Sequence, residues 1–447
     1  MAIVFVLVAL LVLAVIVTAN WYVWRRLFRD TTRGPGLTRR AGAVLIAGGW
    51  VLAVTALVAE RTGAPFWLQQ VLAWPGFLWL ALSMYLLLAV LAGEVVRPLL
   101  RRFLERRVRA GQRGGEPGSV PAAPAPSEKV TVPGGAADPV PPGPKPAPAP
   151  GPAGDPAQPP TPTDPAGTPA PTGPSRRLFV SRVVGGAAAA AAVGTVGYGT
   201  YGVLRGPEVK RITVPLAKLP RGAHGYRIAV VSDVHLGPVL GRGFAQKVVD
   251  TVNATQPDLI AVVGDLVDGS VQDLGPAAAP LAQLRARHGS YFVTGNHEYF
   301  SGAEQWVEEI RRLGLTPLEN ARRELPHFDL AGVNDIAGED EGQGPDFARA
   351  LGDRDRARAC VLLAHQPVQI HDAVEHGVDL QLSGHTHGGQ LWPGNLIASG
   401  ANPTLAGLER YGDTQLYVSR GAGAWGPPTR VGAPSDITVI ELASKQA

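Results

Sequence analysis

The 447-residue sequence has only one cysteine, Cys360, and the lack of a second excludes any intramolecular disulfide. The C-terminal half also lacks a basic excess. Residues 1–205 hold 20 Lys and Arg against 9 Asp and Glu, whereas residues 206–447 hold 21 against 28. A nucleic-acid-binding protein would carry its basic excess on the soluble domain. We therefore expect no nucleic-acid binding. The basic residues lie instead beside apolar segments, where they orient helices in a bilayer.

Charged side chains are almost absent from three apolar stretches, at about residues 2–24, 41–59 and 71–91. Each has about the 20 residues that a helix needs to cross a hydrocarbon core, so residues 1–115 are predicted to form a membrane domain with three transmembrane helices. The first stretch lacks the basic start of a cleaved signal peptide. The scarcity of charge in these spans gives no sign of a transport path. Arginines before the second span and after the third predict an outside N-terminus.

Residues 116–174 have few aromatic or large aliphatic side chains and consist mostly of Pro, Ala and Gly, which predicts a disordered linker. Ser175-Arg-Arg-Leu-Phe-Val-Ser181 follows and leads into a Gly/Ala-rich apolar run, so residues 175–205 are predicted to hold a fourth transmembrane helix. Arg176 and Arg177 resemble a twin-arginine export signal. The alternative is two more positive-inside arginines. Both interpretations place residues 206–447 outside the cytoplasm of a multi-pass membrane protein.

Residues 206–447 alternate apolar strands with amphipathic helices, which indicates an α/β domain. Strands are expected at 228–231, 259–263, 291–294, 360–363, 378–382, 416–419 and 437–441. Helices are expected at 244–253 and 303–313, with another that ends over 281–287. Five polar clusters follow apolar strands: Asp233-Val-His235, Gly264-Asp265, Gly295-Asn-His-Glu298, His365, and Gly384-His-Thr-His-Gly-Gly-Gln390.

The spacing of these clusters favours a metal site. In Asp-x-His, an extended chain places both side chains on one side, where one metal can bind both. Ligands at the carboxyl ends of successive strands meet in one crevice of an α/β sheet. Imidazole, carboxylate and amide groups without a thiolate suit Mn, Fe or Zn.

The order of these motifs resembles the signature of the calcineurin-like metallophosphoesterase family over about residues 225–445. Gly-His-Thr-His-Gly-Gly-Gln is similar to a membrane-associated or exported branch. The resemblance implies two facing β-sheets flanked by helices (αββα), two divalent metal ions, and a metal-bridging hydroxide that attacks a phosphomono- or diester. It also implies that His297 protonates the leaving oxygen. The implied ligands are Asp233, His235 and His387 for the first ion, Asp265 for both, and Asn296, His365 and His385 for the second.

A second interpretation stays open, a non-catalytic metal-binding membrane sensor or scaffold. Loss of a ligand or of His297 would favour it, and none is missing. Membrane attachment suggests phospholipid headgroups or cell-envelope phosphoesters as substrates. Around the site, Glu298 is interpreted as an orienting residue. Asp268 has two interpretations, the same orienting role or an ordinary exposed loop carboxylate, and the second is favoured. Arg430 and Asp436 are left without a role.

Overall fold

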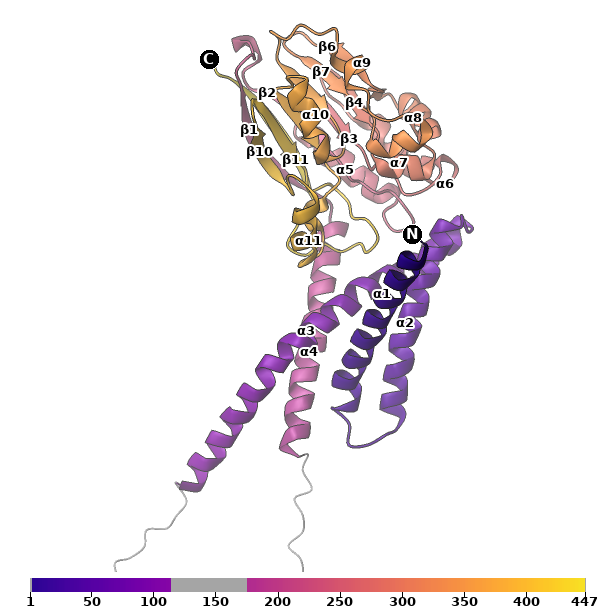
Figure 1. The fold of residues 1–447 in the computed structure, drawn as a ribbon, viewed down its shortest axis with the longest axis vertical. Coiled ribbons are helices and arrows are strands. Elements are labelled where there is room, and N and C mark those ends of the chain that lie inside the picture. The colour runs from indigo at the N-terminus through magenta and orange to yellow at the C-terminus, as the bar shows by residue number, and fades with distance from the viewer. Residues whose placement is uncertain (1, 114–174, 447) are drawn as a thin grey trace, which may run out of the picture.

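The computed structural model describes residues 2–113 and 175–446, and Figure 1 shows their arrangement. The segment predicted as a linker, residues 116–174, lies outside the described residues. Long helices form the lower part of the molecule in this view. Two β-sheets with their covering helices form the upper part, and the N-terminus lies near the boundary between the two parts.

Four of the described helices are long and apolar enough to cross a membrane. They are α1 (Ala2–Trp24), α2 (Leu37–Arg61), α3 (Phe66–Arg113) and α4 (Arg176–Leu204). α2 and α3 extend beyond the predicted apolar stretches, because the adjoining arginines are good helix formers. A short π-helix, η1 (Arg25–Arg29), follows α1. In η1, Arg26 Nη2 lies 2.8 Å from Glu94 Oε2, and this ion pair joins the end of α1 to α3.

Six strands form the first sheet, in the order β1-β12-β2-β3-β4-β5. They are β1 (Glu208–Leu216), β2 (Tyr226–Val231), β3 (Leu259–Val263), β4 (Ser290–Val293), β5 (Thr316–Pro317) and β12 (Asp436–Ser444). β2, β3, β4 and β5 are parallel, and β12 runs antiparallel to β2. The C-terminal strand is therefore inserted between β1 and the parallel part of the sheet.

The second sheet also has six strands, in the order β10-β11-β9-β8-β7-β6. They are β6 (Ala321–Glu324), β7 (Asp329–Gly332), β8 (Cys360–Leu363), β9 (Leu380–Ser383), β10 (Gly407–Tyr411) and β11 (Thr414–Val418). The inner strands β7, β8, β9 and β11 are parallel, whereas the outer strands β6 and β10 are antiparallel to their neighbours.

The two sheets face each other across a shared core. Alternation along β2 places Ile228 and Val230 in this core, and Ala229 and Val231 under the helices on the other side. The first sheet is covered by α5 (Arg242–Ala254), α6 (Val271–Ala278) and α8 (Ala303–Arg312). The second is covered by α9 (Phe347–Leu351) and α10 (Ile370–Glu375). This αββα arrangement, preceded by apolar helices, confirms the predicted fold class.

The predicted helical ending over 281–287 is wrong. α6 ends at Ala278, and a 3-10 turn, η3 (Ala279–Gln283), follows it. The chain leaves the turn because the Asn253 side chain binds the backbone here. Its amide donates to the carbonyl of Gln283 at 2.8 Å, and its oxygen accepts from the N–H of Arg285 at 2.9 Å. These bonds replace those that a continued helix would make.

Candidate metal centre

The polar clusters of the sequence meet at one edge of the two sheets. Three clusters follow β2, β3 and β4 of the first sheet, and two follow β8 and β9 of the second. Because the strands within each group are parallel, their carboxyl ends lie on the same edge. The structure thereby brings together His297 and all the predicted ligands, Asp233, His235, Asp265, Asn296, His365, His385 and His387.

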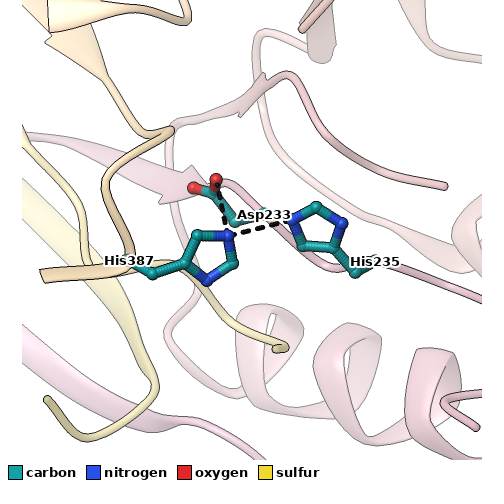
Figure 2. Close-up of side chains that lie close together, drawn as sticks. All are labelled: Asp233, His235 and His387. Atoms are coloured by element: carbon teal, nitrogen blue, oxygen red, sulfur yellow. Dashed lines mark hydrogen bonds and ion pairs between the residues drawn. The ribbon is translucent and has the colours of Figure 1, made fainter. Parts of the chain in front are cut away.

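One group of side chains is shown in Figure 2 and consists of Asp233, His235 and His387. One ligand atom from each lies within 4.8 Å of the others. The Nε2 atoms of the two histidines are 3.0 Å apart, and His387 Nε2 is 3.4 Å from Asp233 Oδ1. All three residues are buried. Two imidazole nitrogens and a carboxylate oxygen thus converge on one point, as a divalent cation requires.

A second group consists of Asp265, His365 and His385, whose ligand atoms also lie within 4.8 Å of one another. Asn296 adjoins it, with Oδ1 3.0 Å from His385 Nδ1. Asp265 lies between the two groups, because its Oδ2 atom is 3.1 Å from His365 Nε2 and 3.8 Å from His235 Nε2. His365 Nε2 is buried and has no hydrogen bond among the described residues.

The backbone of these loops adopts an uncommon conformation. Asp233, His235, Asp265, His385 and His387 all have left-handed φ angles, between 48° and 71°. Each such residue costs about 1–3 kcal/mol and persists only where its surroundings fix it. Contacts between neighbouring loops hold these residues in the left-handed conformation. The turns that follow the strands thereby fix the positions of the candidate ligands.

Gly264 and Gly295 allow these turns to approach each other. A Cβ added at Gly264, whose φ is +71°, would lie 2.6 Å from His365 Nδ1 and 2.7 Å from the backbone of Gly295. A Cβ at Gly295 would lie 2.6 Å from the backbone nitrogen of Asp265. Only glycine leaves room for this contact between the β3 and β4 loops.

The favoured interpretation of Asp268 as an exposed loop carboxylate is wrong, and its contacts agree with the alternative, an orienting role. Its side chain is only 10% exposed, and Oδ1 lies 3.0 Å from Nδ1 of His235 and 2.6 Å from Nδ1 of His297. A short parallel bridge between Leu236 and Val267 brings the β3 loop beside the β2 loop and so places Asp268 here. Although burial opposes the charge, the neighbouring His235 lowers the pKa of Asp268 to about 2.

Glu298 and Arg430 support the loops from behind. The buried carboxylate of Glu298 accepts from the backbone N–H groups of Asp265, Leu266 and Gly295, at 2.6–2.9 Å, in line with an orienting role. The buried guanidinium of Arg430 donates to the carbonyl of His387 at 3.0 Å and lies 2.9 Å from its Nδ1 atom. In the sequence, Arg430 lies outside the five polar clusters and therefore has no predicted role.

Asp436 lies outside this centre. It begins β12, and its carboxylate accepts from the hydroxyls of Ser419 and Thr438 at 3.4 and 3.3 Å.

Glu60, which belongs to none of the sequence motifs, reaches the centre from the end of α2. It lines a cavity of about 20 Å³ together with His235 and Asp268, so the end of a membrane-type helix reaches the site.

The protonation of the histidines follows from their neighbours. Burial, and next the charge of His365, lower the pKa of His385 to about 4. Burial, and next His235, lower the pKa of His387 well below its usual value. Both rings are therefore neutral at pH 7, the form that binds metals. For His235, burial opposes the charge, but Asp268 raises the pKa to about 9.

Comparisons with known proteins agree with this site. A family model described as calcineurin-like phosphoesterase matches residues 226–389. The chain is 34% identical over 243 residues to an uncharacterized metallophosphoesterase of Aquifex aeolicus. The matched region covers 53% of this chain and 92% of that protein. The chain belongs to the calcineurin-like metallophosphoesterase family. The family predicted from the motifs is therefore confirmed. The clustered His and Asp residues fit a metal-dependent family.

Some relatives of this metallophosphoesterase are named as transmembrane proteins. It is 38% identical over 264 residues to a transmembrane protein with metallophosphoesterase domain of Danio rerio, which covers 56% of this chain and 60% of that protein. The chain thus spans about 60% of that relative's length. Among solved structures, a putative 5'-nucleotidase from Staphylococcus aureus is similar with a TM-score of 0.31 and 14% identity, over 48% of this chain and 54% of that one.

Proposed function

We propose that this metallophosphoesterase hydrolyses phosphomono- or diesters with the help of two divalent metal ions. The observation that carries the proposal is the pair of adjacent ligand groups with Asp265 between them. The first ion would be held by Asp233, His235 and His387, and the second by Asn296, His365 and His385. Asp265 would contact both.

The residues fit such ions in their chemistry. The ligand set contains imidazoles, carboxylates and one amide, which suits Mn, Fe or Zn. Within the described part of the chain, Nε2 of His365 makes no hydrogen bond of good geometry but lies 3.1 Å from Asp265 Oδ2, so an imidazole and a carboxylate face each other in the buried centre, an arrangement that a cation would complete. Bound there, a pair of divalent ions supplies an activated water and neutralises charge on the phosphoryl oxygens.

His297 is the proposed acid that protonates the leaving oxygen. Its side chain is 14% exposed, and Nδ1 lies 2.6 Å from Asp268 Oδ1. Burial opposes the charge, but the hydrogen bond to Asp268 raises the pKa of His297. Asp268 therefore holds the proton on Nδ1 and leaves the Nε2 proton available for transfer. The backbone N–H of His297 donates to Asp265 Oδ1 at 2.9 Å. This bond fixes the backbone that carries the ring relative to the proposed ligands.

We further propose that the protein is a multi-pass membrane protein with an extracytoplasmic catalytic domain at residues 206–447. Four helices able to cross a membrane support attachment, and the arginine-rich flanks support the orientation. Phospholipid headgroups and envelope phosphoesters are the substrates that this location suggests.

The test uses the purified full chain in detergent, stripped with EDTA and reloaded with Mn²⁺. Hydrolysis of bis-p-nitrophenyl phosphate and of p-nitrophenyl phosphate is compared, and Asp265→Asn serves as the inactive control. We expect metal-dependent turnover in the unmodified chain and none in the variant. The ratio of the two rates then assigns the preference for diesters or monoesters.

Two outcomes would contradict the proposal. A folded chain that binds two metals but hydrolyses neither ester would favour the sensor or scaffold interpretation. A folded chain that binds no metal, as measured by elemental analysis after gel filtration, would show that the ligand assignment itself is wrong.

A further inference from the structure

A short helix near the candidate metal centre is apolar and uncovered. None of the eight residues of α11 (Gly394–Ala401) is buried. Leu396 and Ile397 are 67% and 79% exposed, and Trp392, just before the helix, is 51% exposed. Soluble proteins seldom expose neighbouring large apolar side chains in this way.

The segment that contains α11 also lacks charge. Residues 388–408 include no Asp, Glu, Lys, Arg or His. Exposed segments of soluble domains normally interleave charged residues, whereas a segment buried in the acyl region of a bilayer carries few of them, because charge is costly there. The absence therefore points to a lipid surface as the occupant of this face.

The position of α11 agrees with a lipid surface. It projects from the sheets toward α3 and α4 in Figure 1. The hydroxyl of Tyr85 on α3 donates to the carbonyl of Trp392 at 2.8 Å, and Leu391 packs against the apolar cluster formed by the membrane-type helices. The start of α11 therefore lies beside the helices that are long and apolar enough to cross a bilayer.

Two tyrosines of α4 lie at the same junction. Tyr198 and Tyr201 are 79% and 63% exposed and line a cavity of about 640 Å³ between α4 and the 430–435 loop. Tyrosine is enriched where a helix leaves the hydrocarbon core. Gly432 of the same loop lies against Trp392, since an added Cβ would be 3.5 Å from Trp392 Cβ. Tyr198, Tyr201 and Trp392 thus all lie around the 430–435 loop, where the membrane-type helices meet the sheets.

The side of the candidate site at Trp425, which we take as its entrance, adjoins this face. The ring of Trp425, which is 52% exposed, lies 5.6 Å from the ring of His297. Gln390, two residues before Trp392, donates to the carbonyl of Trp425 at 2.8 Å. On the α2 side, the cavity shared by Glu60, His235 and Asp268 has room for about one water molecule. A substrate must therefore approach from elsewhere than the α2 side.

We propose that Trp392 and α11 insert into the bilayer surface and hold the entrance of the site against the lipid headgroups. The insertion would present phosphoesters of membrane lipids to the metal centre, and this consequence rests on the proposed function. The insertion itself does not, because it follows from exposure, absence of charge and contact with α3.

The insertion is tested with the full chain reconstituted in liposomes of phosphatidylcholine and phosphatidylglycerol. Ile397→Cys introduces a site for an environment-sensitive fluorophore, while the native Cys360 is buried and stays unlabelled. Arg323→Cys on β6, an exposed position at the far end of the domain, is the matched control. We expect nitroxide-labelled lipids to quench the label at position 397 and aqueous iodide to quench only the label at 323.

Equal quenching of both labels by iodide would overturn the insertion. So would a label at 397 that neither quencher reaches, in particles whose mass is that of a dimer, because a second copy of the chain would then cover α11.

A functional measurement uses two substrates with the same leaving group. Bis-p-nitrophenyl phosphate is soluble, and phosphatidyl-p-nitrophenol is embedded in the bilayer. Ile397→Glu should lower the rate on the lipid about tenfold, the loss expected for one large apolar side chain, and leave the soluble rate unchanged. Ile397→Val should leave both unchanged. An equal loss on both substrates would contradict a role in lipid presentation. If the unmodified chain hydrolyses neither of these diesters nor the monoester p-nitrophenyl phosphate, the phosphoesterase proposal fails, and the fluorophore still decides the insertion.

Discussion

At the scale of single residues, the candidate site depends on carboxylates that are absent from the proposed ligand set. Asp268 accepts from both His235 and His297, so one carboxylate fixes the orientation of a proposed ligand and of the proposed acid. Such a partner determines the tautomer of each ring and hence which nitrogen faces the centre. Its loss should affect both functions together.

Asp268→Asn tests this dependence. An amide can still bond to one histidine but carries no charge, so we expect the catalytic rate of the Mn²⁺-loaded chain to fall about 10–100-fold. Asp340→Asn, at an exposed position, is the matched control. The measurement is the rate of ester hydrolysis together with the affinity for Mn²⁺. An Asp268→Asn variant as active as the control would exclude the proposed role of Asp268.

Arg430 gives a prediction on stability. Its guanidinium is buried and donates to the carbonyls of Gly423, His387, Ala433 and Arg420 at 2.6–3.1 Å. Arg430→Met would remove these four hydrogen bonds, and among the described residues only the carbonyl of His387 would keep another donor, the N–H of Gln390, so the free energy of unfolding should fall by about 2–4 kcal/mol.

Thermal or chemical unfolding of the full chain in detergent measures this loss. Arg356→Met, at an exposed arginine, should change the stability by less than about 0.5 kcal/mol. Equal stability of the two variants would show that the bonds of Arg430 contribute nothing net.

At the scale of elements, the alternation of strands and helices was predictable because each buried strand is a continuous apolar run. The predicted strands at 259–263 and 360–363 coincide with β3 and β8. The helical ending over 281–287 was not predictable, since a side chain from α5 decides it. α11 was also missed, because a segment without charge or periodicity gives no amphipathic signal.

The same limit applies to the candidate site. The motifs name residues that follow strand ends, and parallel strands bring such residues together, so the grouping of His and Asp residues could be expected. Asp268 could not be placed in this way. Its position depends on the bridge between Leu236 and Val267, a contact between two loops that leaves no pattern in the sequence.

β8 offers a probe of the whole sheet. Cys360, the one cysteine of the chain, is fully buried in it, and burial raises the pKa of its thiol to about 12. The thiol is thus neither accessible nor ionised at pH 8, and we expect no reaction with a disulfide reagent in the native chain. In denaturant it should react fully. Arg323→Cys adds an exposed thiol that should react at once, and equally fast reaction of Cys360 would contradict its burial.

At the scale of the whole molecule, the helical part and the sheets share direct contacts. Gly199 of α4 lies against the loop before β12, where the N–H of Arg430 donates to its carbonyl at 3.3 Å. The hydroxyls of Thr200 and Thr429 are 2.7 Å apart. Because Arg430 also contacts His387, α4 touches the residue that supports the candidate site. The packing at Gly199 should therefore influence both stability and activity.

Gly199→Ala tests this coupling, with Gly197→Ala as its matched control on the same helix. A Cβ at Gly199 would lie 2.6 Å from the carbonyl oxygen of Arg430, whereas a Cβ at Gly197 would meet nothing within 4 Å. Alanine favours a helix over glycine by up to about 1 kcal/mol at either position, so Gly197→Ala should keep or raise the melting temperature. Gly199→Ala should lower it, because overpacking costs about 1–3 kcal/mol. It should also reduce ester hydrolysis, since the shift of Arg430 reaches His387. Equal melting temperatures and rates for the two variants, measured on the full chain in detergent, would show that α4 anchors the catalytic domain without supporting its site.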